Sequence, residues 1–362
     1  MRILIDIGHP AHVHLYKNLY FTLINKGHKV LVTAKDSTSI NELLSVYGIS
    51  YLPIGNKKDS IRGKLLSQIK FDLRLFKLVK QHKIDLAIGS SITIAHISLI
   101  SKMRSVLLDD DDDKVQPLFV KFAHPFCSTL LSPEALYGRR KRKDTIYYPG
   151  YHELAYLHPN RFTPDPGVLD EIGISAGAAF FVLRFNAFKA HHDVGVKGLS
   201  LSQKLKLVEI LKPLGKIFIT TEREIENELK DYQLSITPEK IHSLLYYATL
   251  FIGDSQTMTT EAALLGTPAL KCNTFAGVLS VPNELENQYK LCFSFLPGDF
   301  DIMIKKTKEL LSLPDLKEEW NRRRSKMLEN KLDVTSFLVW FIENYPESQS
   351  KIKDNRVNLE EL

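Results

Sequence analysis

The sequence has few cysteines and no long apolar run, and each absence excludes a class of protein. Cys127, Cys272 and Cys292 are scattered through 362 residues, which fits neither a disulfide framework nor a zinc site. No apolar stretch reaches the roughly 18 residues of a membrane-spanning helix. Met1 leads directly into Arg2-Ile3-Leu4-Ile5, which is typical of a strand and not of a secretion signal. We therefore expect a cytoplasmic protein without a bound structural metal.

Charge is concentrated in two short blocks within a chain of net charge +6. Asp109–Asp113 holds five consecutive acids, and Arg139–Lys143 holds five consecutive basic residues. Because like charges repel one another, we expect both blocks to form exposed loops. A second interpretation of the basic block is peripheral contact with anionic lipid at the inner face of the membrane. No basic stripe interleaved with aromatic residues occurs, which argues against a nucleic-acid partner.

The first half of the chain alternates strand-like and helix-like segments. The predicted strands are 2–7, 29–33, 49–54, 84–88 and 105–108, and the predicted helices are 13–26, 37–47 and 65–82. Gly27 and Gly48 follow two of these helices, as glycine does at a helix end. The alternation predicts a parallel sheet that is covered by helices on both faces.

A stretch rich in Pro, Gly, His and Tyr interrupts this rhythm before a second alternation begins. The later strands are predicted at 179–184, 216–220, 250–252 and 269–271, and the helices at 202–212, 242–248 and 258–265. Both halves share one pattern, so two Rossmann-like α/β domains are the simplest interpretation. We predict an N-terminal domain over 1–150, a linker over 151–177, a second domain over 178–335, and a C-terminal helix with a polar tail over 336–362.

The turn after the predicted strand 250–252 has the features of a phosphate site. The strand ends at Gly253, and small polar residues lead into a helix near Thr257. Backbone N–H groups at such a helix start attract phosphate, and the hydroxyls of Ser255 and Thr257 add donors. Glu261 lies where its carboxylate could accept hydrogen bonds from a ribose diol. The alternative is an ordinary turn, in which Asp254 or Ser255 caps the helix and Glu261 complements its dipole.

Three histidines follow the first strand. His9, His12 and His14 lie at the carboxyl edge of the predicted sheet, where open α/β folds place their sites. Histidine has a pKa near neutrality and can accept a proton from an attacking hydroxyl. Two other interpretations are polar residues at a helix start and a metal cluster, although the spacing matches no zinc motif.

A second polar segment follows the strand 179–184. Arg184, Lys189, His191 and His192 are candidates for contact with a diphosphate or an acidic sugar, and the alternative is a polar surface loop. His152 lies in the predicted linker and is a candidate for contact with substrate.

The segment Leu250–Leu270 resembles the nucleotide motif of GT-B glycosyltransferases of the MurG type. In those enzymes a small-residue turn precedes a helix that carries a glutamate, and a Gly-x-Pro follows. Gly266-Thr267-Pro268 supplies that ending here. The resemblance implies that Glu261 holds the ribose of a nucleotide.

The start of the chain shares a second feature with that group, in which a Gly-His pair opens the first helix and a glycine ends it. Gly27 follows His12 by fifteen residues, which is the spacing of the group, so the resemblance implies that His12 is the catalytic base. The sequence departs from the pattern because Ala11 replaces a glycine and Leu15 stands where proline is usual. The base therefore stays open between His12 and its two neighbours, His9 and His14.

The chain as a whole resembles the DUF354 family of bacterial and archaeal proteins over most of residues 1–295. The similar segments are 5–13, 27–30, 33–36, 150–157, 183–185 and 252–268. This resemblance implies a GT-B fold, in which a nucleotide-sugar site lies in the cleft between an acceptor-side domain and a nucleotide-binding domain. It also implies a role in surface polysaccharide or glycoconjugate synthesis.

These resemblances imply an inverting glycosyltransferase with a nucleotide-activated, UDP-linked sugar as donor and a sugar or lipid-linked acceptor. The resemblance implies a reaction without a cofactor or a metal. One alternative is a non-hydrolysing UDP-sugar 2-epimerase, which shares the fold and needs no acceptor. Another is a sugar-nucleotide-binding protein without turnover.

Overall fold

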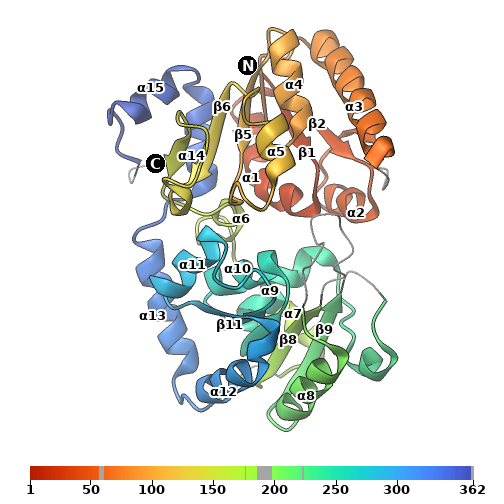
Figure 1. The fold of residues 1–362 in the computed structure, drawn as a ribbon, viewed down its shortest axis with the longest axis vertical. Helices are drawn as coiled ribbons and strands as arrows, with labels where there is room; N and C mark the ends of the chain where they lie inside the picture. Colours follow the sequence, from red (N-terminus) through yellow and green to blue (C-terminus); the bar gives the residue numbers. More distant parts are fainter. Residues whose placement is uncertain (57–60, 176, 186–197, 222–223, 360–362) are drawn as a thin grey trace. The chain divides into compact units, whose positions relative to one another are not determined.

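The computed structural model describes the whole chain except residues 57–60, 176, 186–197, 222–223 and 360–362 (Figure 1). Contacts divide the chain into two compact units. Unit 1 comprises Met1–Arg161 and Lys331–Leu362, and unit 2 comprises Phe162–Asn330. Among the helices described, none combines the length and apolar character needed to cross a bilayer.

Unit 1 is built on a seven-stranded parallel sheet with the order β3-β2-β1-β4-β5-β6-β7. The strands are β1 (Arg2–Ile7), β2 (Lys29–Lys35), β3 (Leu52–Gly55), β4 (Leu86–Gly89), β5 (Arg104–Leu108), β6 (Thr129–Pro133) and β7 (Ile146–Tyr148). Strand order reverses beside β1, because β2 lies on one side of it and β4 on the other. Ligand sites of open α/β sheets lie at such a reversal, outside the carboxyl ends of the strands.

Helices cover both faces of this sheet, which confirms the prediction for the first half. They are α1 (Pro10–Asn25), α2 (Thr38–Val46), α3 (Ile61–His82), α4 (Ile92–Ile100), α5 (Pro117–Phe122), α6 (Leu154–Leu157), α14 (Val334–Glu343) and α15 (Glu347–Lys353). On one face α3 packs against α4 over a core that includes Leu4, Leu75 and Leu107. Elsewhere in the unit, α1 packs against α6 and α14.

Glycine ends α1 and α2 by the same backbone device. Gly27 has φ 84° and Gly48 has φ 64°, a left-handed conformation that favours glycine. After α1, the N–H of His28 donates to the carbonyl of Leu23 and the N–H of Gly27 donates to that of Ile24. This crossed pair of bonds satisfies the last carbonyls of the helix, so the predicted helix ends are confirmed.

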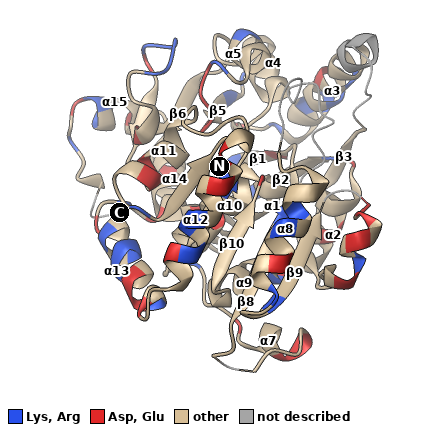
Figure 2. Ribbon diagram, turned by 60° about the horizontal axis from the view of Figure 1, so that its bottom comes forward, with Lys and Arg blue, Asp and Glu red and all other residues tan. Residues whose placement is uncertain are grey.

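Unit 2 contains a five-stranded parallel sheet with the order β12-β11-β10-β8-β9. The strands are β8 (Phe180–Phe185), β9 (Lys216–Thr221), β10 (Leu250–Gly253), β11 (Ala269–Cys272) and β12 (Cys292–Phe295). The α-helices are α7 (Gly167–Glu171), α8 (Leu201–Leu211), α9 (Ile241–Tyr247), α10 (Gln256–Leu264), α11 (Ser280–Asn287), α12 (Phe300–Leu311) and α13 (Leu316–Leu328). Charges of both signs line α12 and α13 (Figure 2). Two parallel α/β sheets confirm the predicted fold class.

The sequence pattern did not predict which unit contains the segments around the predicted linker and at the C-terminus. Helix α6, inside the span assigned to the linker, is fully buried and packs against α1 in unit 1. The C-terminal helix α14 also packs against α1, so the chain returns to unit 1 from Lys331 onward. These contacts join residues far apart in sequence, which periodicity cannot detect.

The left-handed conformation of Gly27 can be tested by substitution. Gly27→Ala should lower the free energy of unfolding by about 1 kcal/mol, because an L-residue is strained at positive φ. Space is not the cause, since an added Cβ would meet nothing within 4 Å. Gly298→Ala is the matched control, because that position is equally open and has no positive φ. Calorimetric melting should show a lower transition for the first variant only, and equal shifts would contradict the explanation.

Candidate functional site

The carboxyl ends of the strands in unit 1 bring chemically active side chains to one edge. His9 follows β1 and caps α1, and His12 and His14 lie in the first turns of that helix. The loop after β5 carries the acidic block, and the segment after β7 carries His152. Contacts link these loops. Tyr16 Oη lies 3.5 Å from Ser90 Oγ after β4, and His152 Nδ1 lies 3.2 Å from Asp110 Oδ1. The sequence predicted a site at this edge, and the structure brings these polar residues together there.

His9 and His14 have local roles in holding α1. His9 precedes the helix, and its Nδ1 accepts a hydrogen bond from the N–H of Ala11 at 3.2 Å. His14 is buried, its Nδ1 lies 3.1 Å from the Tyr47 hydroxyl, and its ring packs against Tyr47 and Tyr156. These contacts give both histidines a structural role in holding α1, and neither contact favours His9 or His14 as the base.

His12 lies at the edge in a defined tautomer. The N–H of Gly8 donates to His12 Nδ1 at 3.3 Å. A backbone N–H can only donate, so a neutral His12 carries its proton on Nε2. Burial, followed by the nearby charges of His9, His152 and Lys35, lowers the pKa of His12 to about 3. His12 is therefore neutral near pH 7 and presents a donor, whereas a base must present a lone pair.

His152 has the opposite arrangement. Burial alone would raise the pKa of Asp110, but the charge of His152 and a hydrogen bond from it outweigh that effect and lower it to about 2. Asp110 is thus an ionised acceptor, so His152 Nδ1 donates to it. Within the described part of the chain, His152 Nε2 and the Tyr148 hydroxyl are buried without a hydrogen-bond partner. The two rings stack at 6.4 Å with an interplanar angle of 8°.

The prediction that the acidic and basic blocks are exposed loops is wrong for their buried members, which are Asp109, Asp112, Asp113 and Arg140. The Arg140 side chain has no exposed surface and lies 3.0 Å from Asp109 Oδ2 and 2.9 Å from Asp113 Oδ1. Arg142 donates to the carbonyl of His124 at 2.6 Å. The two blocks neutralise each other, an outcome that repulsion within one block does not predict. Arg139, Lys141 and Lys143 are exposed, and contact between them and lipid stays a prediction.

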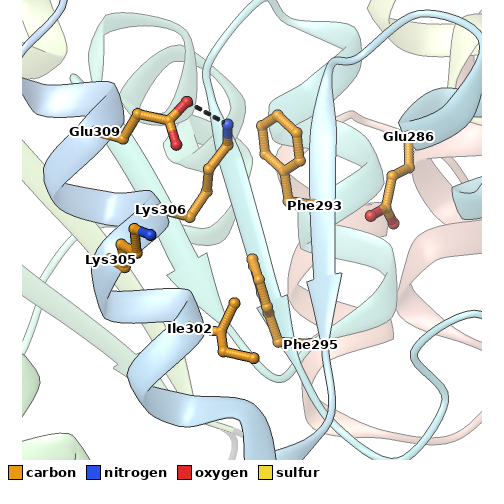
Figure 3. A pocket seen from close by; sticks show the side chains of 7 residues that line it. All are labelled: Glu286, Phe293, Phe295, Ile302, Lys305, Lys306 and Glu309. Atoms are coloured by element: carbon orange, nitrogen blue, oxygen red, sulfur yellow. Dashed lines mark hydrogen bonds and ion pairs between the residues drawn. The ribbon is translucent and has the colours of Figure 1, made fainter.

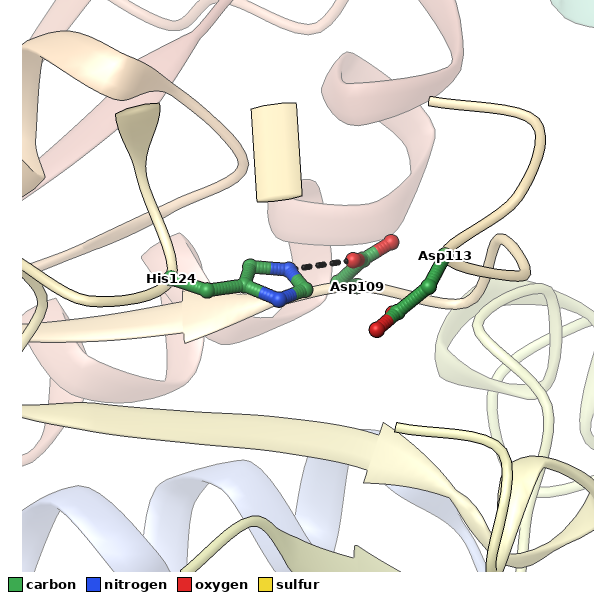
Figure 4. A group of neighbouring side chains, drawn as sticks. All are labelled: Asp109, Asp113 and His124. Atoms are coloured by element: carbon green, nitrogen blue, oxygen red, sulfur yellow. Dashed lines mark hydrogen bonds and ion pairs between the residues drawn. The ribbon is translucent and has the colours of Figure 1, made fainter. Parts of the chain in front are cut away.

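Asp109, Asp113 and His124 form a cluster whose ligand atoms lie within 4.8 Å of one another (Figure 4). The three types of side chain suit a divalent cation. However, the Arg140 guanidinium contacts both carboxylates, and His124 Nε2 lies 2.7 Å from Asp109 Oδ2. The carboxylates already have a cationic partner, so we interpret the cluster as an ion-pair network that fixes the loop after β5.

The phosphate-site candidate of unit 2 has the predicted strand, turn and helix. Strand β10 ends at Gly253, where an added Cβ would lie 2.6 Å from the carbonyl oxygen of Arg184 on β8, so only glycine fits. Ser255 caps α10 by accepting a hydrogen bond from the N–H of Met258 at 3.4 Å. Thr257 follows in the first turn and is partly exposed.

Glu261 is in the middle of α10 and is almost fully buried. Its Oε1 lies 3.0 Å from His242 Nε2 on α9, and this pair joins the two helices. The predicted contact between Glu261 and a ribose stays a prediction beside this structural pairing.

Arg184 lies near the carboxyl end of β8, where its guanidinium donates to Thr220 Oγ1 at 2.8 Å. Lys189, His191 and His192 lie outside the described residues, so their predicted contacts with a diphosphate or an acidic sugar stay predictions.

Lys271 is a candidate site residue that the sequence patterns did not indicate. It lies in β11 with no exposed surface, and its Nζ lies 2.6 Å from Gln256 Oε1 in the first turn of α10. Burial lowers the pKa of Lys271 to about 8, and nearby Cys292 and Glu286 oppose this only in part. A lysine between apolar residues of a predicted strand was the available signal. It places a cation beside the start of α10.

The surface of unit 2 also has a hollow of about 330 Å³ that is formed by β12, α11 and α12 (Figure 3). Its floor contains Phe293 and Phe295, and the Lys306–Glu309 ion pair lies at its rim. None of the predicted site residues lines it, so we place the candidate site at the strand ends.

Comparison with known families decides the relationship of the chain. The family model described as "Protein of unknown function (DUF354)" matches residues 1–292. The chain belongs to the DUF354 family. The predicted family resemblance is thereby confirmed. The uncharacterized protein MJ0665 of Methanocaldococcus jannaschii is 23% identical to this DUF354 protein over 283 residues, which is 74% of this chain and 80% of that protein.

Solved structures share the fold of this DUF354 protein at low sequence identity. The MnaA–UDP structure from S. aureus matches with a TM-score of 0.68 at 13% identity, covering 96% of this chain and 97% of that one. The Neisseria meningitidis UDP-GlcNAc 2-epimerase bound to UDP-GlcNAc matches with 0.67 at 11%, covering 97% and 100%. The spinosyn rhamnosyltransferase SpnG matches with 0.62 at 14%, covering 95% and 100%. The predicted GT-B fold is confirmed.

The buried arginine yields a prediction about unit 1. Arg140→Met should destabilise this DUF354 protein by roughly 3–5 kcal/mol, because Asp109 and Asp113 would remain buried without their cation. Lys143→Met removes the same charge from an exposed position and is the control. Chemical denaturation followed by circular dichroism measures both. If both variants unfold like the wild type, the ion pairs contribute nothing to stability.

Proposed function

We propose that this DUF354 protein is an inverting glycosyltransferase that uses a nucleotide-activated sugar, with UDP-linked sugars as the first donors to test. The observation that carries the proposal is the buried ammonium of Lys271 beside the start of α10. Its support is the fold, since structures that share it were solved with UDP and with UDP-GlcNAc.

A diphosphate explains why a lysine is buried at this position. Burying an ammonium in an apolar strand is costly unless an anion or strong acceptors surround it. The one hydrogen bond of Lys271 Nζ among the described residues is to a neutral amide oxygen, that of Gln256. The first N–H groups of α10 and the hydroxyls of Ser255 and Thr257 add donors at the same place. Together they would neutralise the charge that develops on the departing nucleotide.

The carboxyl edge of unit 1 supplies the groups for the other half of the reaction. Direct displacement at the anomeric carbon requires that the acceptor hydroxyl lose its proton. Two histidines, His12 and His152, and the carboxylate of Asp110 lie at this edge and can bind that hydroxyl and take its proton. In this proposal the nucleotide-sugar is a substrate, the acceptor is a sugar or a lipid-linked sugar of surface polysaccharide or glycoconjugate synthesis, and no separate cofactor takes part.

A UDP-sugar 2-epimerase is the second candidate, and the same edge favours it because proton abstraction from a sugar carbon also needs paired acid and base groups. The two activities differ in one observable. An epimerase converts UDP-GlcNAc without any acceptor, and NMR of the sugar would show a second isomer. A transferase leaves the donor configuration unchanged until an acceptor or water takes the sugar.

The nucleotide site predicts a specific loss of binding. Lys271→Met keeps most of the length of the side chain and removes its charge, so affinity for UDP should fall at least tenfold, roughly 1.5–3 kcal/mol. Lys317→Met is the matched control. Lys317 is also largely enclosed with a pKa lowered to about 8, but its Nζ bonds the carbonyl of Tyr246 at 2.7 Å and lies away from the start of α10. Calorimetric titration with UDP, GDP and CMP measures each affinity. Failure of the wild type to bind any of them would end the proposal.

The same lysine predicts a pH dependence of donor binding. Lys271 is protonated below its pKa of about 8 and loses its charge as the pH rises through that value. Affinity for UDP-GlcNAc should therefore be highest near pH 7 and weaken progressively between about pH 8 and pH 9. Lys271→Met should bind weakly at every pH, with a flat profile over that range. A flat profile in the wild type would show that Lys271 does not face the ligand.

A further inference from the structure

Two buried polar atoms in unit 1 lack hydrogen-bond partners among the described residues. They are His152 Nε2 and the Tyr148 hydroxyl, and the rings that carry them are stacked. A buried polar atom without a partner is costly, and in a native protein it usually indicates a bound water, a ligand or a catalytic role. Burial raises the pKa of Tyr148 well above its usual range, so its hydroxyl stays protonated.

Asp110 determines which ring nitrogen of His152 has a lone pair available to accept a proton. The carboxylate lies 3.2 Å from Nδ1 and is only an acceptor, so the ring proton of neutral His152 resides on Nδ1. The lone pair then resides on Nε2, the atom that has no partner. An aspartate that orients a histidine in this way also stabilises the cation formed when Nε2 takes a proton.

His12 is arranged to donate a hydrogen bond and not to accept a proton. Its Nδ1 lone pair is already used by the N–H of Gly8, so Nε2 carries the proton. His12 would have to break that bond and change tautomer before it could act as a base. As it stands, it can donate a hydrogen bond to a substrate oxygen.

We propose that His152, oriented by Asp110, is the base that deprotonates the acceptor hydroxyl, and that His12 donates a hydrogen bond at the same edge. The inference rests on the proposed glycosyl transfer. It replaces His12, the base implied by resemblance, with a histidine from the segment after β7.

The proposed step transfers one proton and one glycosyl group. The acceptor O–H bond breaks, and its proton passes to His152 Nε2 directly or through one water. The oxygen lone pair forms a bond to the anomeric carbon of the nucleotide-sugar. The bond from that carbon to the diphosphate oxygen breaks, and its electron pair leaves with the nucleotide. Asp110 stays ionised beside the imidazolium, and no oxidant or reductant is needed.

The tautomers can be measured without knowledge of the acceptor. The full-length protein labelled with ¹⁵N-histidine is observed by NMR, and His152→Asn and His12→Asn assign the two rings. We expect His152 to carry its proton on Nδ1 and His12 on Nε2. A proton on Nε2 of His152 in the neutral ring would overturn the proposal, because that atom would have no lone pair.

The catalytic role is measured by release of UDP from UDP-GlcNAc and UDP-glucose, with water as the acceptor. His152→Asn places an amide nitrogen in the position of Nδ1 and lacks the base. Its kcat should fall by about 10²–10⁴-fold while the Kd for UDP is unchanged. His12→Asn should lower kcat only about tenfold, as expected for one lost hydrogen bond. The reverse order of the two losses would return the role of base to His12.

A second Asp–His pair in unit 1 provides the matched control. His96 Nδ1 on α4 lies 2.9 Å from Asp72 Oδ2 on α3, so the same two types of side chain are paired in another part of unit 1. His96→Asn should leave both kcat and the Kd for UDP unchanged. A similar loss of kcat in this variant would show that disrupted packing, and not the loss of a base, explains the effect.

Asp110 is a positioning residue in this proposal. Its variants distinguish the orientation of His152 from an effect on the stability of the protein. Asp110→Asn should lower kcat with little change in KM, because it leaves His152 without its ionised acceptor. Asp110→Glu retains the charge and should restore part of the lost kcat. If both variants reduce kcat equally while they melt like the wild type, Asp110 does not orient the base.

The outcomes also separate this inference from the proposed function. Wild-type protein that binds no nucleotide would refute the proposed function, whatever the tautomers are. Protein that binds UDP and releases it from a donor, but tolerates His152→Asn, would refute only the role of His152. Binding without release from either donor would remove both the transfer reaction and its base.

Discussion

The ion pairs of Arg140 hold the loop after β5, and the carboxyl edge of unit 1 depends on that loop. The guanidinium contacts Asp109 and Asp113, and its Nε donates to Ser132 Oγ at 3.0 Å. A planar cation with several fixed donors determines the positions of its acceptors more strictly than apolar packing does. Asp110 lies between the two anchored carboxylates. Its position toward His152 therefore follows from contacts made by its neighbours in the sequence.

In each unit a glycine ends a central strand, at a point where that strand closely approaches its neighbour. An added Cβ at Gly89 would lie 2.8 Å from the carbonyl oxygen of Asp6, and one at Gly253 would lie 2.6 Å from that of Arg184. In each case a strand end closely approaches the first strand of its own sheet. The chain can then turn into the next loop or helix at the carboxyl edge without a side chain in the way. In unit 2 the candidate phosphate site begins at that point.

Sequence patterns predicted the local parts of this structure well. Strand β1, the ends of α1 and α2, and the turn into α10 each depend on residues close together in the chain. Helix α4 was missed because six of its nine residues are apolar and they follow no clear helical period. Strand β6 was missed because its five residues are all buried and show no alternation, and β7 was missed because it has only three residues.

The chemistry of the site was less predictable, because it depends on partners that are distant in sequence. The blocks 109–113 and 139–143 were interpreted separately, and their mutual neutralisation became visible only when both lay at one edge. His152 was a candidate for substrate contact, but its tautomer depends on Asp110 in another loop. Likewise, the hydrogen bond from Lys271 to Gln256 identifies Lys271 as a candidate, because it places the ammonium beside the start of α10.

The return of the chain to unit 1 has a consequence for how the protein is made. Helix α14 packs against α1 and α6, and its buried residues include Phe337 and Phe341. During synthesis, unit 2 leaves the ribosome after the first 161 residues and before α14. The apolar surface of α1 and α6 that α14 covers therefore stays exposed while unit 2 is translated. That interval is when the nascent chain is most exposed to chaperone binding and to aggregation.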